Sequence, residues 1–304
     1  MPVPSLPPLP PRSATEIVDG AVQLIRPHFG YFLRIAAIGA IPSLLSSVVS
    51  LLLNQGRPTD AASLLQRQTE VIPLLMTLLV YLFAAMQSGA IVTGALAVLR
   101  GDQLPSVWNA FMSAFQRLHI LIAAAILIVL LFSIAMLPLI LVLGIAGFAL
   151  GTGITSGFGT GTGAVIAGAL IAIAAIVFLG TIMSTLFAQS VLTTTLVVAE
   201  RAGPVAAIRR ALTLSRGNYA LLAKTYSLVL LIMMVISSVM VVVMLSFLEQ
   251  QQLVQSIFSV LFIPVAPIVG SIGLVSYADL RVRREGADLD ASLDALASAS
   301  VPLA

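Results

Sequence analysis

The stretch that decides the fold is residues 199–226, AERAGPVAAIRRALTLSRGNYALLAKTY, which lies between two long apolar runs. It holds five of the 15 lysines and arginines of the chain: Arg201, Arg209, Arg210, Arg216 and Lys224. A short basic segment between apolar runs is typical of a cytoplasmic loop in a helical membrane protein. Two weaker copies of this pattern occur earlier in the chain, at residues 13–26 and 100–118.

The composition indicates an all-α, polytopic integral membrane protein. Hydrophobic residues make up 59% of the chain and charged residues only 9%. A soluble domain carries about 25% charged residues, so this chain cannot cover a surface that faces water. It has no cysteine and only two histidines, which excludes disulfides and thiolate metal sites. We therefore expect neither a metal nor a cofactor.

Six apolar runs have at least about the 20 residues that cross a bilayer. They cover residues 31–53, 71–99, 119–150, 164–198, 219–248 and 253–280. The charge-free run 119–199 counts as two spans, because the basic segments on either side of it should share one face of the membrane. The Gly-rich run 151–163 separates these two spans, and Pro264 and Pro267 are expected to kink the last one.

A short amphipathic helix precedes each odd-numbered span, and we expect it to lie in the membrane interface. Ser13 and Glu16 form the pattern of a capping box at the start of the first helix, and Pro27 and Gly30 should break that helix from its span. Apolar residues at helical spacing form one face of each helix: Ile17, Val18, Ala21, Val22 and Ile25; Val107, Trp108, Phe111, Phe115 and Leu118; and Val205, Ile208 and Leu212.

The distribution of charge predicts the orientation. Thirteen of the 15 lysines and arginines fall in the two terminal regions and in the second and fourth loops. Such an asymmetry places these segments on the cytoplasmic side, so we expect a multi-pass protein of the inner membrane with both termini in the cytoplasm. The domain organisation is a Pro-rich tail at 1–12, the six-span domain at 13–286 and a C-terminal tail at 287–304.

The chain also suggests a three-fold internal repeat, in which each unit is a short helix followed by two spans. Gln87-Ser88 lies 13 residues before Arg100, and Gln189-Ser190 lies 12 residues before Arg201. The last span has no such pair. The alternative interpretation is that basic cytoplasmic loops look alike in any polytopic protein.

Three strings resemble blocks of a known family: EIVDGAVQLIRPHFGYFL at 16–33, RAGPVAAIRRALTLSRGNY at 201–219 and YADLRVRREGADLD at 277–290. They look like those of the glycerophosphoryl diester phosphodiesterase membrane-domain family, whose members are six-span bacterial proteins. The resemblance implies that fold, and some members also carry a phosphodiesterase barrel. Such a barrel takes about 250 residues, and no segment here could supply it, so the resemblance implies a stand-alone membrane domain.

Two glutamines are the main intramembrane polar candidates, because an amide in hydrocarbon must find a partner. Gln87 and Gln189 are expected to face the bundle, where hydrogen bonding between helices is favoured over lining a substrate path. Asp279, near the end of the last span, is expected to pair with Arg281 or Arg283. We find no constellation of catalytic residues, so the sequence predicts no enzyme.

The five basic residues of 199–226 are candidates for contact with anionic lipid headgroups, each contributing about 1 kcal/mol near such a surface. The alternative is that they serve orientation only. The first function hypothesis is a non-catalytic scaffold or accessory subunit of an inner-membrane assembly, with membrane lipids and other membrane subunits as partners and no nucleic acid. The second is a carrier or handler of a lipid or small amphiphile, which requires a cavity that reaches Gln87 or Gln189.

Overall fold

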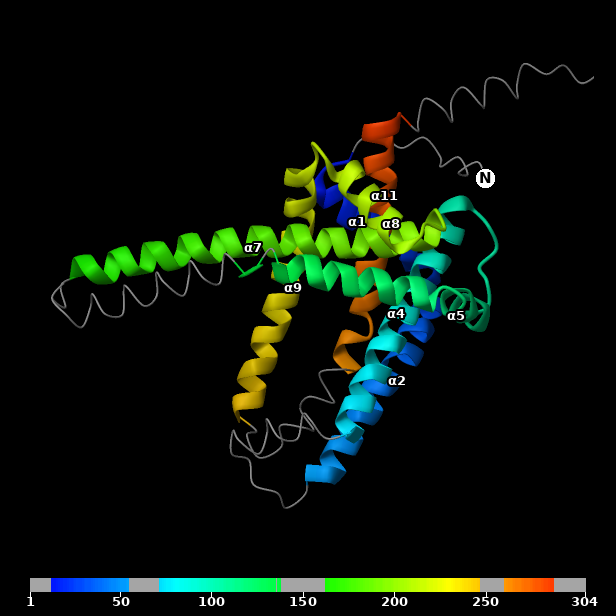
Figure 1. The fold of residues 1–304 in the computed structure, drawn as a ribbon, viewed down its shortest axis with the longest axis horizontal. Coiled ribbons are helices and arrows are strands. Elements are labelled where there is room, and N and C mark those ends of the chain that lie inside the picture. Colours follow the sequence, from blue (N-terminus) through cyan, green and yellow to red (C-terminus); the bar gives the residue numbers. More distant parts are fainter. Residues whose placement is uncertain (1–11, 55–70, 135, 138–161, 247–259, 287–304) are drawn as a thin grey trace, which may run out of the picture.

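The computed structural model describes residues 12–54, 71–134, 136–137, 162–246 and 260–286 (Figure 1). Within these ranges the regular elements are helices: α1 (Ala14–Ile25), the 3₁₀ turn η1 (Arg26–His28), α2 (Phe29–Asn54), α4 (Val71–Arg100), α5 (Val107–Phe115), α7 (Thr162–Ala199), α8 (Pro204–Ser215), α9 (Tyr219–Ser246) and α11 (Val265–Glu285). A further helix, Leu118–Ile134, follows α5 after a bend of 64°.

Five helical segments of the described chain are long and apolar enough to cross a membrane, and a sixth is added if α5 and Leu118–Ile134 form one bent span. The prediction of an all-α membrane protein is therefore confirmed. The expected Pro-rich tail up to residue 11, most of the Gly-rich run 151–163 and the C-terminal tail 287–304 lie outside the described residues.

Both ends of the first helix follow the sequence pattern. The capping box of α1 is confirmed, because the Ser13 N–H donates to Glu16 Oε2 at 2.6 Å and the Glu16 N–H donates to Ser13 Oγ at 3.4 Å. α1 ends at Ile25, as the expected break at Pro27 requires, and the break expected at Gly30 is wrong. Pro27 sits at the start of η1, where no N–H is required, and Gly30 continues in α2.

The buried core lies at one end of the molecule, which we call the core end. It is formed by α1, α5, α8 and the adjoining ends of α2, α4, α7, α9 and α11. The largest fully buried side chains there include Phe32, Tyr226 and Tyr277. Toward the opposite end large apolar side chains are exposed, such as Leu52, Leu78 and Val239. Exposed apolar surface on this scale is what lipid-facing helices require.

Three helices meet at the centre of the core end. α4, α7 and α11 contact one another, and each short helix packs mainly on one of them: α5 on α4, α8 on α7 and α1 on α11. α11 is the most enclosed, with every residue from Ser271 to Leu280 buried. Away from this centre the helices diverge: in Figure 1, α7 and Leu118–Ile134 run across the view, whereas α2, α4 and α9 run downwards.

The short helices turn small residues inward. α5 buries Ala110 and Ala114 together with Phe111, and α8 buries Ala207 and Ala211. The bulky residues expected to form the apolar face are mostly outside, with Trp108, Val205 and Leu212 exposed by 69%, 51% and 45%. Close packing of α5 on α4 and of α8 on α7 explains the difference, because only small side chains let helix backbones approach closely. In α1 the expected face is largely correct, since Ile17, Ala21 and Ile25 are buried.

Candidate functional site

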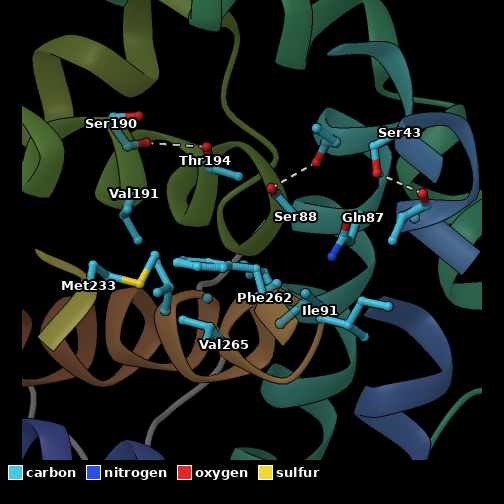
Figure 2. A pocket seen from close by; sticks show the side chains of 18 of the residues that line it. Ser43, Gln87, Ser88, Ile91, Ser190, Val191, Thr194, Met233, Phe262 and Val265 are labelled. Atoms are coloured by element: carbon cyan, nitrogen blue, oxygen red, sulfur yellow. Dashed lines mark hydrogen bonds between the residues drawn. The ribbon is translucent and has the colours of Figure 1, made fainter. Parts of the chain in front are cut away.

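A cavity of about 450 Å³ lies below the core, where α2, α4, α7, α9 and the beginning of α11 converge (Figure 2). We call it the amide cavity, after Gln87 of α4, which lines it. Its walls are otherwise mostly apolar and include Ile91, Phe187, Val191, Met233, Phe262 and Val265. Its volume falls in the range of about 300–1,000 Å³ that is usual for small-molecule sites.

Three of the hydroxyl groups that line the cavity, those of Ser43, Ser88 and Thr194, already donate a hydrogen bond within their own helices. Ser43 Oγ donates to Ala40 O at 2.7 Å, Ser88 Oγ to Ala84 O at 2.8 Å, and Thr194 Oγ1 to Ser190 O at 3.2 Å. Figure 2 shows these bonds running back along the helices rather than across the cavity. Such bonds satisfy the hydroxyl proton at little cost to the helix. These three hydroxyls therefore keep only acceptor capacity toward the cavity.

The Gln87 amide is different, because it has no hydrogen-bond partner among the described residues. Its place is set by Gly39 of α2. A Cβ added to Gly39 would lie 2.7 Å from the Cβ of Gln87 and closer still to its amide group. Only a glycine leaves room for the glutamine here. The fold thus holds an unpaired amide, with one acceptor and two donors, at the wall of an apolar space.

The last span breaks beside this cavity. A helical turn ends at Phe262, and α11 begins at Val265 with Pro264 as its N-cap. Phe262, Ile263 and Val265 all line the cavity. Irregular backbone at membrane depth is tolerated where it is buried in protein or lines a cavity. The break predicted at Pro264 is confirmed, whereas Pro267 lies within α11 and does not interrupt it.

The chemistry of the amide cavity is neutral. Among the described residues that line it, none is acidic, basic or histidine. Apolar walls favour an acyl chain or another hydrocarbon group, and the free amide offers hydrogen bonds to an ester, amide or hydroxyl group. A charged group would be strongly disfavoured there, because nothing around it could neutralise the charge.

Gln189 does not reach the cavity and instead links two helices. Its Nε2 donates to Ser215 Oγ of α8 at 2.8 Å, while its Oε1 is buried without a partner in the described chain. Ser215 in turn donates to Ala211 O at 2.7 Å. The two glutamines therefore have different surroundings although the sequence places them at equivalent positions. Gln189 fastens α8 to α7, and Gln87 faces open space.

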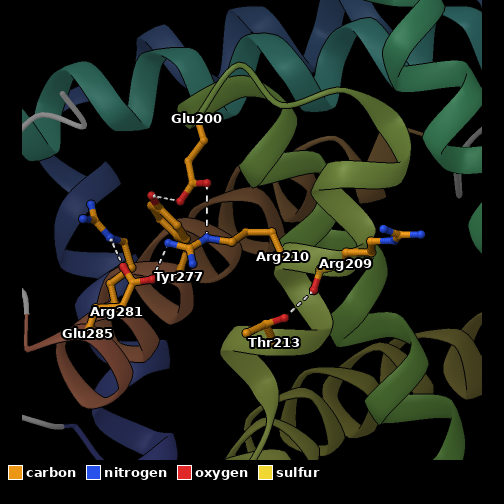
Figure 3. A network of polar contacts seen from close by, with 7 residues as sticks. All are labelled: Glu200, Arg209, Arg210, Thr213, Tyr277, Arg281 and Glu285. Carbon is orange, nitrogen blue, oxygen red and sulfur yellow. Dashed lines mark hydrogen bonds and ion pairs between the residues drawn. The ribbon is translucent and has the colours of Figure 1, made fainter. Parts of the chain in front are cut away.

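One arginine of the basic stretch, Arg210, takes part in a network of polar contacts at the core end (Figure 3). Arg210 pairs with both Glu200, at 3.4 Å, and Glu285. Arg281 Nε pairs with Glu285 at 3.0 Å, and its guanidinium lies 5.8 Å from the ring centre of Tyr277. The Tyr277 hydroxyl completes the network by donating a hydrogen bond to Glu200 at 2.9 Å. This network joins the end of α7 to α8 and α11.

The other four candidates for headgroup contact lie outside this network. Arg201, Arg209, Arg216 and Lys224 are exposed, and none of them forms an ion pair with a described residue. Figure 3 shows the Arg209 guanidinium pointing away from the network, although Arg210 is its neighbour in sequence. Adjacent residues on a helix point in different directions. Arg210 therefore forms ion pairs within the protein, whereas Arg209 is left without one among the described residues.

Asp279 pairs with Arg283, one of the two partners that the sequence allowed. Asp279 is only 3% exposed, and its Oδ2 accepts from Arg283 Nε at 2.6 Å. Its Oδ1 accepts from the backbone N–H of Arg12 at 2.7 Å, and Arg283 also donates to the Arg12 carbonyl at 2.6 Å. This pair therefore clamps the beginning of the described chain onto α11.

Comparisons with protein-family models, curated proteins and solved structures find no match to this chain. The resemblance noted in the sequence is therefore neither supported nor contradicted and stays a prediction. In the part of the chain that the structure describes, no three acidic or histidine side chains come close enough together to hold a metal ion.

Most residues that line the amide cavity could not be identified from the sequence. Phe187, Met233 and Phe262 look like ordinary lipid-facing residues in apolar spans, and nothing in their local pattern sets them apart. Gly39 was a usable signal, since an isolated glycine inside a helix points to a close approach of another group. Glu200 was another, because it is an acidic residue at the end of a span with basic residues close behind it.

Proposed function

We propose that this protein is an integral membrane carrier or handler of a neutral amphiphile, bound in the amide cavity. The observation that carries the proposal is the cavity itself, because it reaches Gln87 and Gly39 leaves that side chain its space. A tightly packed bundle would have favoured the scaffold hypothesis instead. The occupant we infer is a single acyl chain, or a hydrocarbon of similar size, that carries an uncharged ester, amide or hydroxyl group.

The proposed setting is the inner membrane, with both termini in the cytoplasm. The core end, where Arg209, Arg216 and Lys224 are exposed, would face the cytoplasm, in keeping with the positive-inside rule. The exposed Trp108 of α5 and Val205 and Leu212 of α8 would then lie at the headgroup level, where aromatic and apolar side chains anchor interfacial helices.

We further propose that the chain is a three-fold repeat of one unit. The order of elements supports this, since α1, α5 and α8 are each followed by a pair of longer helices. The packing supports it as well. Each short helix packs on the second long helix of another unit, with α1 on α11 closing the circle, and these three long helices contact one another at the centre. The amide cavity would lie close to the axis of the repeat.

The scaffold hypothesis is kept as a second proposal because of a separate groove. An apolar groove of about 480 Å³ runs between α4 and Leu118–Ile134, lined by Leu78, Tyr81 and Ile126 among others. Such a groove would suit an apolar helix of a membrane partner. Both proposals are non-catalytic.

The carrier proposal is tested by photocrosslinking. The probe is a monoacylglycerol with a diazirine in its acyl chain, added to the full chain in phosphatidylcholine vesicles. We expect labelling of residues such as Met233 and Phe262. Ala84→Phe places a ring in the cavity wall and should lower this labelling by about five- to a hundredfold, since overpacking costs about 1–3 kcal/mol.

The matched control is Val239→Phe, which adds the same ring at a position exposed by 59% on α9. It should leave the labelling of Met233 and Phe262 unchanged. Labelling of lipid-facing residues alone, or equal labelling in the two variants, would overturn the carrier proposal. In that case, co-purification of one defined membrane protein with both Ala84→Phe and Val239→Phe would favour the scaffold hypothesis.

A further inference from the structure

A second cavity, of about 480 Å³, lies at the core end between the ends of α4 and α7 and the turn that follows α5. We call it the arginine cavity, because Arg100, Arg117 and Arg201 all line it. Arg100 is the last residue of α4, Arg117 lies in the turn after α5, and Arg201 lies between α7 and α8. The amide cavity shares no lining residue with it.

Arg117 is held in place by the end of α7. Its Nη1 donates to the carbonyl oxygens of Val197 at 3.0 Å and Val198 at 3.4 Å. It therefore caps the helix, whose last carbonyls have no partner within the helix. A guanidinium has five N–H donors in a fixed fork, so one nitrogen is used for the cap and the others are left for a ligand. Its side chain is pre-organised before anything binds.

The carboxylates at the cavity do not neutralise the three arginines. Glu200 lines the cavity, but its two oxygens already interact with the Tyr277 hydroxyl and with Arg210. Asp102 is the other acidic residue in the wall. Three cations therefore face one uncommitted anion. Burial lowers the pKa of the Arg117 guanidinium, and the like charge of Arg201 lowers it further, which places these two cations close together.

Arg201 also has an unfavourable backbone conformation. Its φ is +55°, and it is the one described residue other than glycine with a positive φ. This left-handed region costs free energy for a residue with a Cβ and none for glycine. Gly203 follows two residues later, so the loop carries a glycine but not at the position that needs it. Non-glycine residues in such conformations cluster at binding sites, where the side chain is required.

We propose that the arginine cavity binds a phosphate group, supplied either by the headgroup of an anionic phospholipid or by a free phosphate compound. Guanidinium groups pair with phosphate through two parallel hydrogen bonds. Three arginines match an anion with several oxygens, and the apolar remainder of the wall, including Leu96 and Pro105, leaves room for the group that carries the phosphate. The site is independent of the proposed carrier function.

The test uses the full chain in a neutral detergent and two probes. Phosphatidylglycerol binding is followed by native mass spectrometry, and inorganic phosphate is added as a competitor and measured alone by calorimetry. The double variant Arg100→Gln/Arg201→Gln should weaken binding at least about tenfold, because each removes a hydrogen bond to a charged group. The matched control, Arg209→Gln/Arg216→Gln, makes the same change of charge outside the cavity and should have less than about a twofold effect, since exposed charges act weakly.

A third variant separates binding from folding. Arg201→Gly relieves the strained backbone, so it should raise or preserve the melting temperature while weakening phosphate binding about as much as Arg201→Gln does. Displacement of the lipid by inorganic phosphate would identify free phosphate as a ligand, and binding of the lipid alone would identify the headgroup. Equal losses in the two double variants, or no binding of either probe to the unaltered chain, would overturn the proposal.

Discussion

Gly39 of α2 lies directly against Gln87 of α4, so closely that a Cβ on the glycine would fall 2.7 Å from the Cβ of the glutamine. Gly39 is buried, and it lines the amide cavity together with Gln87. The contact therefore does two things at once. It lets α2 and α4 approach closely, and it determines where the amide lies in the cavity wall.

Gly39→Ala should lower the free energy of unfolding by about 1–3 kcal/mol, the usual cost of inserting a methyl group into a packed site. It should also move Gln87 and weaken binding of the amphiphile probe. Thermal unfolding in detergent and photocrosslinking measure the two effects. Gly30→Ala is the matched control, because a Cβ there has nothing within 4 Å. It should be neutral or stabilising by up to about 1 kcal/mol. Equal losses of stability and of crosslinking in the two variants would show that Gly39 does not position Gln87.

The close packing of α11 on α7 depends on Gly273. A Cβ at this position would lie 3.0 Å from Thr195 Oγ1 and nearer still to Val191. Gly273→Ala should therefore destabilise the protein by about 1–3 kcal/mol. The control is Gly180→Ala on α7, where the added atom has nothing within 4 Å. It should not destabilise the protein. The test compares the melting temperatures of the two variants in the same detergent. A Gly273→Ala protein as stable as the control would show that α7 and α11 are not packed in this way.

The clamp on Arg12 is tested by limited proteolysis. Asp279→Asn removes the charge that holds the Arg12 N–H and the Arg283 guanidinium. Losing hydrogen bonds to a charged group should make local opening of the chain roughly tenfold more frequent. Trypsin should then cut after Arg12 about tenfold faster. Asp19→Asn, which changes an exposed carboxylate bonded to Gln23, should leave the rate of this cut unchanged.

The proposed orientation is tested with single cysteines, since the natural chain has none. Arg209→Cys and Arg284→Cys both lie in exposed positions at the core end. A membrane-impermeant maleimide should label neither in whole cells and both after the membrane is opened. Arg57→Cys, in the loop that the sequence assigns to the outside, should be labelled in whole cells. Labelling of Arg209→Cys and Arg284→Cys from opposite sides would refute the topology.

The features that could be predicted from the sequence were those with a local cause. Long charge-free runs predicted the helices of spanning length, Ser13 and Glu16 predicted the cap of α1, and Pro264 predicted the break before α11. In each case the decisive physics acts within a few residues or along one helix. The break expected at Gly30 failed because a single glycine costs a helix only about 1 kcal/mol, and Gly30 continues within α2.

What could not be predicted depends on which surfaces meet. Hydrophobic periodicity does not distinguish a face that contacts protein from one that contacts lipid, so the buried Ala207 and Ala211 were passed over in favour of the exposed Val205 and Leu212. The cavities are a stronger case. Arg117 and Arg201 come together only because the end of α7 packs beside the turn after α5, and no local pattern records that contact.

The pairing of α1 with α11 has a consequence for biosynthesis. α1 leaves the ribosome long before α11, yet the surface on which Ile17, Ala21 and Ile25 are buried is provided mainly by α11. At about 5–20 residues per second, α1 waits on the order of ten to fifty seconds for that surface. α4 and α7, which contact each other at the centre, must likewise be inserted while α11, the third helix of that centre, is still missing.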